Sequence, residues 1–168
     1  MRTFTVTEIA VAKTPLMHRR DAPCQPHIQQ GVEGTIEVHE PYVDGLSDLD
    51  GFERIWLLYV FDRNEGYRLK VQPPRGPRHK RGLFATRAPH RPSPIGLTCA
   101  RLLKIEGNVL HVAGIDVLDG TPLLDIKPFV PAFDAPAVTA VGWMAGQLDR
   151  TASTRSDTRF QQPPGQHD

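Results

Sequence analysis

Cysteines and long apolar runs are scarce in this sequence. Only two of the 168 residues are cysteines, Cys24 and Cys99, and they stand 75 positions apart. That spacing fits no metal or redox motif and excludes a disulfide framework, so we expect two inert thiols. No apolar run approaches the roughly 18 residues of a membrane-spanning helix, and the first residues contain no apolar signal block. We therefore expect a soluble cytoplasmic protein without a membrane segment.

The common short motifs of nucleotide binding and of serine hydrolysis are also missing. The sequence contains neither G-x-G-x-x-G nor G-x-x-x-x-G-K-[ST], and none of its serines lies in a G-x-S-x-G. The seven histidines show no paired ligand spacing, so we expect no metal site. The sequence therefore lacks the local signatures of a nucleotide-binding α/β domain, a serine hydrolase and a zinc protein.

Glycine and proline are abundant instead. There are 14 glycines and 16 prolines, a density that argues against a helical bundle or a coiled coil. Apolar residues make up 39% of the chain, enough for one modest core. Short apolar segments separated by turn residues favour an all-β antiparallel barrel or sandwich. The segments predicted as strands are 4–11, 34–39, 54–61, 67–71, 97–105, 109–117 and 123–129.

Few helices are expected in this all-β chain. Apolar residues recur every third position over 46–52, which predicts one or two helical turns, and a second short helix is predicted over 137–148. The segment 54–61 is apolar almost throughout, which is typical of a strand buried on both faces. We expect a single domain over residues 1–148 and a polar, disordered tail over 149–168.

Acidic residues are absent from one-fifth of the chain. Between Arg68 and Arg101 there are nine lysines and arginines and no aspartate or glutamate, whereas the rest of the chain holds 11 basic and 19 acidic residues, a net charge of −8. Seven of the nine are arginines, which suit phosphate recognition and base stacking. This basic segment predicts a polyanionic or phosphorylated ligand, with Tyr67 and Phe84 as stacking candidates. The alternative is an ordinary solvated basic loop.

A second group of residues is acidic and surrounds a turn. Asp116, Asp119 and Asp125 lie within ten positions of one another. Asp119 precedes Gly120, which favours a structural role in the turn. For Asp116 and Asp125, a structural role and a role as carboxylates facing a cationic or hydroxyl-rich ligand remain equally open.

Both groups lie in long motifs that resemble those of a known family. Residues 81–97 (RGLFATRAPHRPSPIGL) and 115–131 (IDVLDGTPLLDIKPFVP) resemble the signature of the TsaA-like (YaeB) family, and the resemblance extends over about residues 4–143. Its characterised bacterial members, the TrmO-type tRNA methyltransferases, use S-adenosylmethionine to methylate the exocyclic amine of threonylcarbamoyladenosine next to the anticodon. The resemblance implies a small β-barrel, a homodimer, a tRNA partner and S-adenosylmethionine as cofactor.

The resemblance also implies a set of site residues. Methylation of an adenine amine needs a carboxylate to orient the amine and take its proton, and the candidates for this catalytic role are Asp116 and Asp125. Phosphate contacts are expected from Arg75, Arg78, Lys80, Arg81 and Arg91. The residues implied to contact the cofactor are Cys24, Gln25, Pro26, His27, Ile28, Asp62, Arg63, Arg87, Leu97, Ala113, Gly114, Ile115 and Asp116.

The sequence departs from the family pattern at four of its positions. Cys24 stands where the family usually has arginine, Asp62 where it has histidine, Ser93 where it has asparagine and Phe129 where it has tyrosine. Two alternatives to a tRNA methyltransferase therefore stay open. One is a module that binds the cofactor or an anion without transferring methyl to tRNA, and the other is a methyltransferase for a small molecule.

Overall fold

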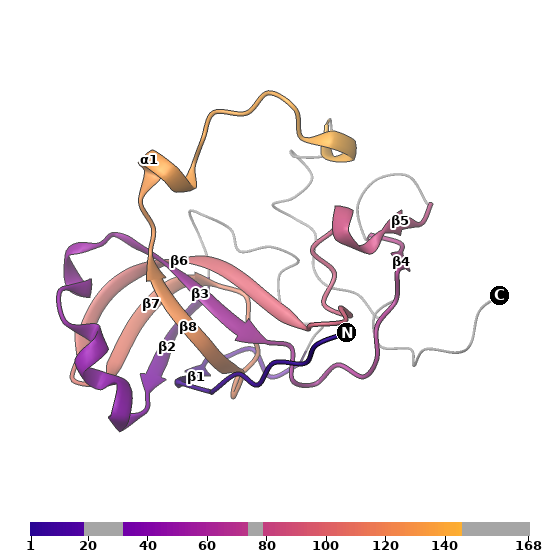
Figure 1. Ribbon diagram of the computed structural model, residues 1–168. Helices are drawn as coiled ribbons and strands as arrows, with labels where there is room; N and C mark the ends of the chain where they lie inside the picture. Colours follow the sequence, from indigo (N-terminus) through magenta and orange to yellow (C-terminus); the bar gives the residue numbers. More distant parts are fainter. Residues whose placement is uncertain (19–31, 74–78, 146–168) are drawn as a thin grey trace.

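Six antiparallel strands close into a barrel (Figure 1). The computed structural model describes residues 1–18, 32–73 and 79–145. The barrel follows the order β1-β2-β7-β6-β3-β8, so the expected antiparallel barrel is confirmed and the sandwich is excluded. Its strands are β1 (Ala10–Lys13), β2 (Val32–Val38), β3 (Arg54–Val60), β6 (Ile95–Glu106), β7 (Val109–Ile115) and β8 (Pro122–Pro128).

Alternation of side chains builds the barrel core. In β3, Ile55, Leu57 and Tyr59 are buried inside the barrel, whereas Trp56 and Leu58 between them are only half-buried. The prediction that this segment is buried on both faces was therefore wrong for the outer face. Successive side chains of a strand point to opposite faces, and in a small closed barrel only the inner face is fully enclosed.

Small residues allow the strands to approach closely. Ala10, Ala12 and Ala100 point inward and are fully buried. At Gly34 in β2, a Cβ atom would lie 2.7 Å from the carbonyl oxygen of Lys13 in β1, so this crossing needs glycine. A barrel of six strands has a narrow interior, and small side chains let it close without voids or overlaps.

Short elements connect and flank the barrel strands. The helical turns predicted over 46–52 are confirmed, although the helical region begins earlier, at Glu40. A two-stranded sheet of β4 and β5 stands beside the barrel (Figure 1). These elements are η1 (Glu40–Leu46), η2 (Leu49–Gly51), β4 (Lys70–Val71), β5 (Arg81–Gly82), η3 (Leu83–Ala85), α1 (Pro131–Asp134) and η4 (Gly142–Met144).

Two predicted strands are shorter in the structure. The strand predicted over 4–11 begins only at Ala10, because Ala10 already pairs with Val38, the last residue of β2, and few partners remain for earlier residues. Of the strand predicted over 67–71, only Lys70–Val71 forms, and it pairs with β5. In both cases the apolar alternation is present, but no neighbouring strand extends far enough to bind the backbone.

The helix predicted over 137–148 is absent from the part of it that the structure describes, residues 137–145. Only the single turn η4 forms there. Gly142 adopts a positive φ of 56°, which an α-helix does not accommodate. Residues 146–168, and with them the predicted tail, lie outside the described residues.

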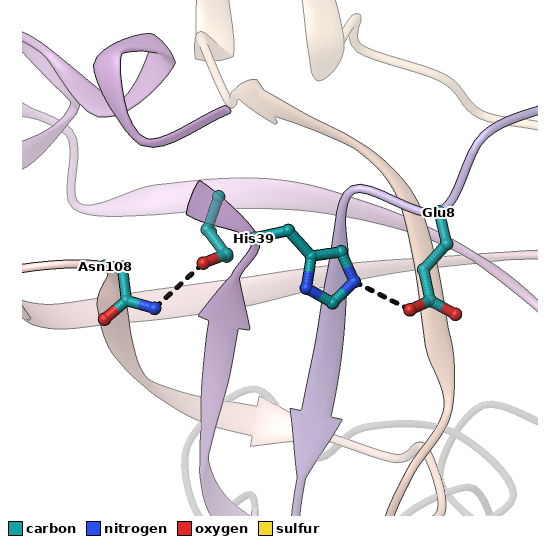
Figure 2. A network of polar contacts seen from close by, with 4 residues as sticks. Glu8, His39 and Asn108 are labelled. Atoms are coloured by element: carbon teal, nitrogen blue, oxygen red, sulfur yellow. Dashed lines mark hydrogen bonds and ion pairs between the residues drawn. The ribbon is translucent and has the colours of Figure 1, made fainter. Parts of the chain in front are cut away.

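Polar side chains tie the N-terminal segment and the β6–β7 hairpin to the end of β2 (Figure 2). The Asn108 side-chain amide donates to the Val38 carbonyl at 2.9 Å, and His39 Nε2 lies 2.7 Å from a carboxylate oxygen of Glu8. These contacts hold the barrel end that is opposite the candidate site described below. Among the described residues, no helix is long and apolar enough to cross a membrane.

Candidate active site at one end of the barrel

Strand direction brings six of the predicted site residues to one end of the barrel. At this end, which we call the site end, β1, β3 and β7 finish and β2, β6 and β8 begin. Asp62 and Arg63 follow β3, while Ala113–Ile115 finish β7 and Asp116 follows it. The two-stranded sheet and η3 also lie on the side toward which β3 points (Figure 1). Residues far apart in the sequence therefore share one end.

A β-bulge at Gly114 turns the chain just before Asp116. Val32 pairs with Ile115 and Glu33 pairs with Ala113, so Gly114 is the extra residue of the bulged strand. Its φ of 80° lies in the left-handed region, where glycine is strongly favoured. Such bulges bend a strand and redirect its side chains. The bulge thus explains why the predicted stretch contains glycine.

Asp116 ends a buried chain of hydroxyl groups. The Thr98 hydroxyl in β6 donates to Asp116 Oδ1 at 2.6 Å, and the Tyr59 hydroxyl in β3 lies 3.3 Å from the Thr98 oxygen. A threonine hydroxyl carries one proton, which Thr98 uses toward Asp116. Tyr59 must therefore donate to Thr98. All donors in this chain point toward the carboxylate.

Burial sets the protonation of both ends of this chain. Burial raises the pKa of Asp116 to about 6, against the opposing effects of the Thr98 hydroxyl, its own backbone N–H and the Arg87 charge. Burial, followed by the nearby Asp116 charge, raises the pKa of Tyr59 well above its usual range. At neutral pH, Tyr59 keeps its proton and Asp116 is mostly ionised. A carboxylate with a pKa near 6 is suited to accepting a proton at that pH.

Gly96 provides the space that the Tyr59 ring occupies. The two residues pair directly across β3 and β6. A Cβ atom at position 96 would overlap the Tyr59 ring. The ring therefore occupies the space that a side chain at position 96 would fill, and its hydroxyl reaches Thr98 two residues along β6.

Arg63 and Asp119 connect the loops of the site end. An Arg63 guanidinium N–H donates to the Asp119 carbonyl oxygen, and Arg63 Nε lies 3.8 Å from a carboxylate oxygen of Asp62. The Asp119 carboxylate accepts the backbone N–H of Thr14 at 3.1 Å. The structural role predicted for Asp119 is therefore confirmed. Asp62 and Arg63, which were predicted to contact the cofactor, lie at the site end directly after β3.

The structure does not bring Asp125 or Leu97 to Asp116 within one chain. Asp125 pairs with the outward-facing Leu58, and its carboxylate binds the Ile126 N–H at 2.9 Å and Lys127 Nζ at 2.7 Å. Leu97 also pairs with Leu58 and is 45% exposed. Both residues thus lie on the outer surface of the barrel, whereas Asp116 interacts with inward-facing residues.

Sequence reasoning missed Tyr59, Gly96 and Thr98. Tyr59 stands in an apolar run that predicts only a core strand. Thr98 carried a usable signal, because it is the one polar side chain among the inward positions 96, 98, 100 and 102 of β6. A buried polar residue in an apolar series must find a hydrogen-bond partner. That partner is Asp116.

Within the basic segment, β4, β5 and η3 lie beside the barrel (Figure 1), whereas residues 95–101 are part of β6. The Arg81 guanidinium lies 5.3 Å from the centre of the Trp143 ring, and the Trp143 ring N–H donates to the Ala85 carbonyl at 2.7 Å. Lys80 is exposed. The predicted residues that lie outside the described residues are Cys24, Gln25, Pro26, His27, Ile28, Arg75 and Arg78.

Among the described residues there is no candidate metal-binding cluster and no thiol with a lowered pKa. No group of three or more histidine, cysteine, aspartate or glutamate side chains in residues 1–18, 32–73 and 79–145 could hold a metal ion. Burial raises the pKa of the Cys99 thiol, so it stays protonated at neutral pH. A protonated thiol is a weak nucleophile. Among the described residues of this end, the Asp116 carboxylate is the acid whose pKa is raised toward neutrality.

Fold and site together define a small antiparallel β-barrel with an ionisable group held at one end, a class distinct from the doubly wound nucleotide-binding domains. Residues 11–135 match the model of the tRNA-methyltransferase O N-terminal domain, and the chain belongs to this family. The match begins within β1, includes the other five strands of the barrel and continues through α1.

Relatives and solved structures agree with this assignment. An S-adenosyl-L-methionine-binding protein of Archaeoglobus fulgidus is 40% identical over 126 residues, which cover 75% of this chain and 89% of the relative. The tRNA (adenine(37)-N6)-methyltransferase of Homo sapiens is 48% identical over 93 residues, or 54% of this chain and 21% of the relative. The crystal structure of TrmO from Pseudomonas aeruginosa matches with a TM-score of 0.70 and 36% identity, over 84% of this chain and 62% of that one. The chain thus spans less than two thirds of that TrmO chain.

Proposed function

We propose that this protein is an S-adenosylmethionine-dependent methyltransferase that modifies the exocyclic amine of threonylcarbamoyladenosine next to the anticodon of tRNA, in the cytoplasm. Membership in the tRNA-methyltransferase O family supports the reaction class. The observation that carries the proposal is the Asp116 carboxylate, which Thr98 holds at 2.6 Å at the site end. A carboxylate with a pKa of about 6 is suited to accepting the proton that a methylated amine releases, which supports this role for Asp116.

The charges at the site end fit S-adenosylmethionine. The cofactor carries a sulfonium, an ammonium and a carboxylate, and it supplies an electrophilic methyl group when bound. Asp116 suits its cationic groups, and the Arg87 charge, which acts on Asp116, suits its carboxylate. The residues proposed to hold the cofactor remain the sequence-predicted set, including those at 24–28. The bulge at Gly114 brings the backbone of β7 into this set.

Methyl transfer to an amine requires removal of a proton. The amine nitrogen forms a bond to the methyl carbon as the carbon–sulfur bond breaks, and the nitrogen then releases one proton. Asp116 is our first candidate to receive it, because its raised pKa makes it a better base than an exposed aspartate. Asp125 is the second candidate, although it lies on the outer surface and is paired with Lys127. Correct alignment of nitrogen, carbon and sulfur supplies much of the acceleration.

The basic segment is proposed to bind the tRNA backbone. Lys80 and Arg81 lie on or next to β5, at the site end. Their charges can neutralise phosphates of an anticodon stem-loop while the loop base enters the site. Arg75 and Arg78 belong to the same proposed surface by sequence.

A homodimer is proposed to form through an apolar outer face of the barrel. On β3 and β6, the pairs Leu58–Leu97 and Val60–Ile95 point outward, and Leu97 and Ile95 are each 45% exposed. Family resemblance supports a dimer, and this face supplies the apolar surface that a stable interface requires. Asp125 pairs with Leu58 at its margin, so a second copy would bring Asp125 into the interface.

The proposal is tested with purified protein, labelled S-adenosylmethionine and tRNA. We expect label in methylated threonylcarbamoyladenosine when the tRNA carries that nucleoside, and no label in tRNA that lacks it. Asp116→Asn is expected to lower kcat/KM by about 100-fold or more, the scale of a lost proton acceptor. Cofactor binding without transfer to tRNA would support the binding module, and label in a small acceptor would support the other alternative.

A further inference from the structure

We propose that Phe84 is a platform on which an unpaired nucleobase of the RNA stacks, with Arg91 fixed against the ring. This inference rests on the proposed tRNA substrate and adds a residue that recognises its loop. It is carried by the anchoring of η3, by the exposure of Phe84 and by the contacts of Arg91.

The backbone that carries Phe84 is firmly anchored. Leu83, the preceding residue, is 1% exposed and packs with Val71 and Ala88 in a small core of its own. Thr86 closes the turn, because its backbone N–H and its hydroxyl both bind the Leu83 carbonyl, at 3.0 and 2.8 Å. A third bond, from the Ala88 N–H to the Thr86 hydroxyl at 3.3 Å, fixes the next residues. The position of Phe84 is thus defined before any ligand binds.

The Phe84 ring is left open to solvent. It is 77% exposed, although its neighbour Leu83 is buried. Burying a phenylalanine side chain is favourable, so the fold forgoes stabilisation at this position. A rigidly held aromatic ring with an accessible surface is the geometry that single-strand binding proteins use for stacking.

Arg91 is fixed against this ring. Its Nη1 donates to the carbonyl oxygens of Thr86 and Ala88, at 3.1 and 3.2 Å. The centre of its guanidinium lies 5.8 Å from the centre of the Phe84 ring, within the range of a cation–π contact. Arg91 was predicted to bind phosphate. Its contacts favour a different main role, in which it orients the ring and leaves its positive charge next to the bound nucleotide.

The surrounding charges select the ligand. The basic segment contains nine cations and no anion in its sequence, so an acidic polymer is favoured over a neutral protein surface. Lys80 and Arg81 precede η3 and are available to neighbouring phosphates. Every nucleobase has a flat face, and stacking therefore suits a loop base of any identity. A single-stranded RNA base is the ligand that satisfies both the ring and the charges.

The test compares Phe84→Leu and Phe84→Trp on two RNAs. One RNA is an anticodon stem-loop, and the other is the same stem with abasic loop nucleotides. Phe84→Leu keeps apolar volume but removes the ring, and we expect about five- to hundredfold weaker binding to the intact loop. Phe84→Trp should bind like the wild type. Neither change should alter binding to the abasic RNA, the salt dependence or the melting temperature, because no phosphate contact and no buried group is lost.

Each other outcome overturns the inference. Unchanged affinity of Phe84→Leu for the intact loop excludes stacking, and an equal loss on both RNAs excludes a base contact. A change in molar mass by light scattering would assign Phe84 to an interface between copies of this chain. If the wild-type protein methylates tRNA and Phe84→Leu does so with unchanged KM, only this inference fails. If the wild type neither binds nor methylates the stem-loop, the proposed function fails with it.

Discussion

The Thr98 hydroxyl is one of the groups that set the pKa of Asp116. Thr98 donates its hydroxyl proton to the carboxylate, and Tyr59 donates in turn to Thr98. A hydrogen bond to the charged form lowers the pKa of an acid, whereas burial raises it. The pKa of about 6 is the balance between burial, which raises it, and the Thr98 hydroxyl, the Asp116 backbone N–H and the Arg87 charge, which lower it. Changes at Thr98 should therefore act on Asp116 without touching the ligand.

Removing the Thr98 hydroxyl should raise the pKa of Asp116. In Thr98→Val the desolvation remains and the hydrogen bond is lost, so the acidic limb of the pH profile of kcat/KM should move to higher pH. Thr98→Ser keeps the donor and should restore the wild-type profile. Titration of the Asp116 carboxyl by carbon NMR checks the same shift without turnover. If the acidic limbs of the pH profiles of Thr98→Val and Thr98→Ser coincide, the Thr98 hydroxyl does not set the pKa of Asp116.

The buried carboxylate should also make stability depend on pH. The pKa of Asp116 has its ordinary value of 3.8 in the unfolded protein and is about 6 in the folded protein. The folded state therefore binds the Asp116 proton more tightly than the unfolded state does. Stability from this group is lost as the pH rises between these two values, by about 3 kcal/mol in all. Asp116→Asn keeps a hydrogen-bond acceptor for Thr98 but has no proton to lose, so its stability should not fall in this way as the pH rises. Urea unfolding of both proteins at several pH values measures the difference, and parallel curves would contradict the assignment.

At the scale of elements, glycine positions decide how strands meet at the site. Gly114 permits the bulge before Asp116, and Gly96 leaves room for the Tyr59 ring. Bulges and close approaches depend on the neighbouring strand, so a local pattern shows the glycine but not its purpose. The basic segment behaves in the opposite way, because its charge count is visible in the sequence alone.

Gly96→Ala should destabilise the protein by about 1–3 kcal/mol, because the new methyl group must displace the Tyr59 ring in a packed core. The displaced hydroxyl should also weaken the contact with Thr98. Gly51→Ala is the matched control, since a Cβ there meets no atom within 4 Å. Denaturant unfolding compares the two variants. Equal stability of both would show that the ring adapts without cost.

Neutralising the basic segment should weaken RNA binding and flatten its dependence on salt. In the triple variant Arg78→Ala, Lys80→Ala and Arg81→Ala, fewer counterions are released on binding, so the slope of log K against log salt should become shallower. Cofactor affinity should change little. Arg87→Ala should show the reverse pattern, because Arg87 acts on Asp116 at the site end. An unchanged slope in the triple variant would identify the segment as a solvated loop.

At the scale of the whole molecule, the barrel separates a buried site end from an apolar outer face. The outward pairs Leu58–Leu97 and Val60–Ile95 contribute nothing to the barrel interior. Leu97 and Asp125 were predicted as site residues and both pair with Leu58 on this outer face. If a second copy of this chain covers the outer face, it would explain why predicted site residues lie both on the outer surface of the barrel and next to its inward-facing residues.

Leu97→Asp should convert the proposed dimer into a monomer. A charge placed on the apolar outer face must be desolvated on association, which opposes pairing. Val138→Asp is the control, since Val138 is 68% exposed and lies away from the barrel strands. Light scattering should report half the wild-type mass for the first variant only. A wild-type protein that is already monomeric at micromolar concentration would contradict the dimer.

The sequence by itself determined the strand-rich class, the basic segment and the family. Alternation, turn residues and charge are local properties, and the two long motifs carry the resemblance without any coordinates. Most of the barrel strands lie where these local patterns predict them. The predicted strand over 4–11 is shorter in the structure, and the predicted helix is absent from residues 137–145, because strand partners and backbone φ values are not local properties of an apolar pattern.

Only the tertiary structure decided what the site contains. Closure of the barrel sets Tyr59 beside Thr98, 39 residues later, and Thr98 beside Asp116, 18 residues later. The irregular register between β3 and β8 leaves Asp125 paired with Leu58 on the outside. Which face a strand residue occupies changes with a shift of one position, so inward and outward aspartates look alike in the sequence. Burial then gives Asp116 its raised pKa, a property of its surroundings and not of the residue type.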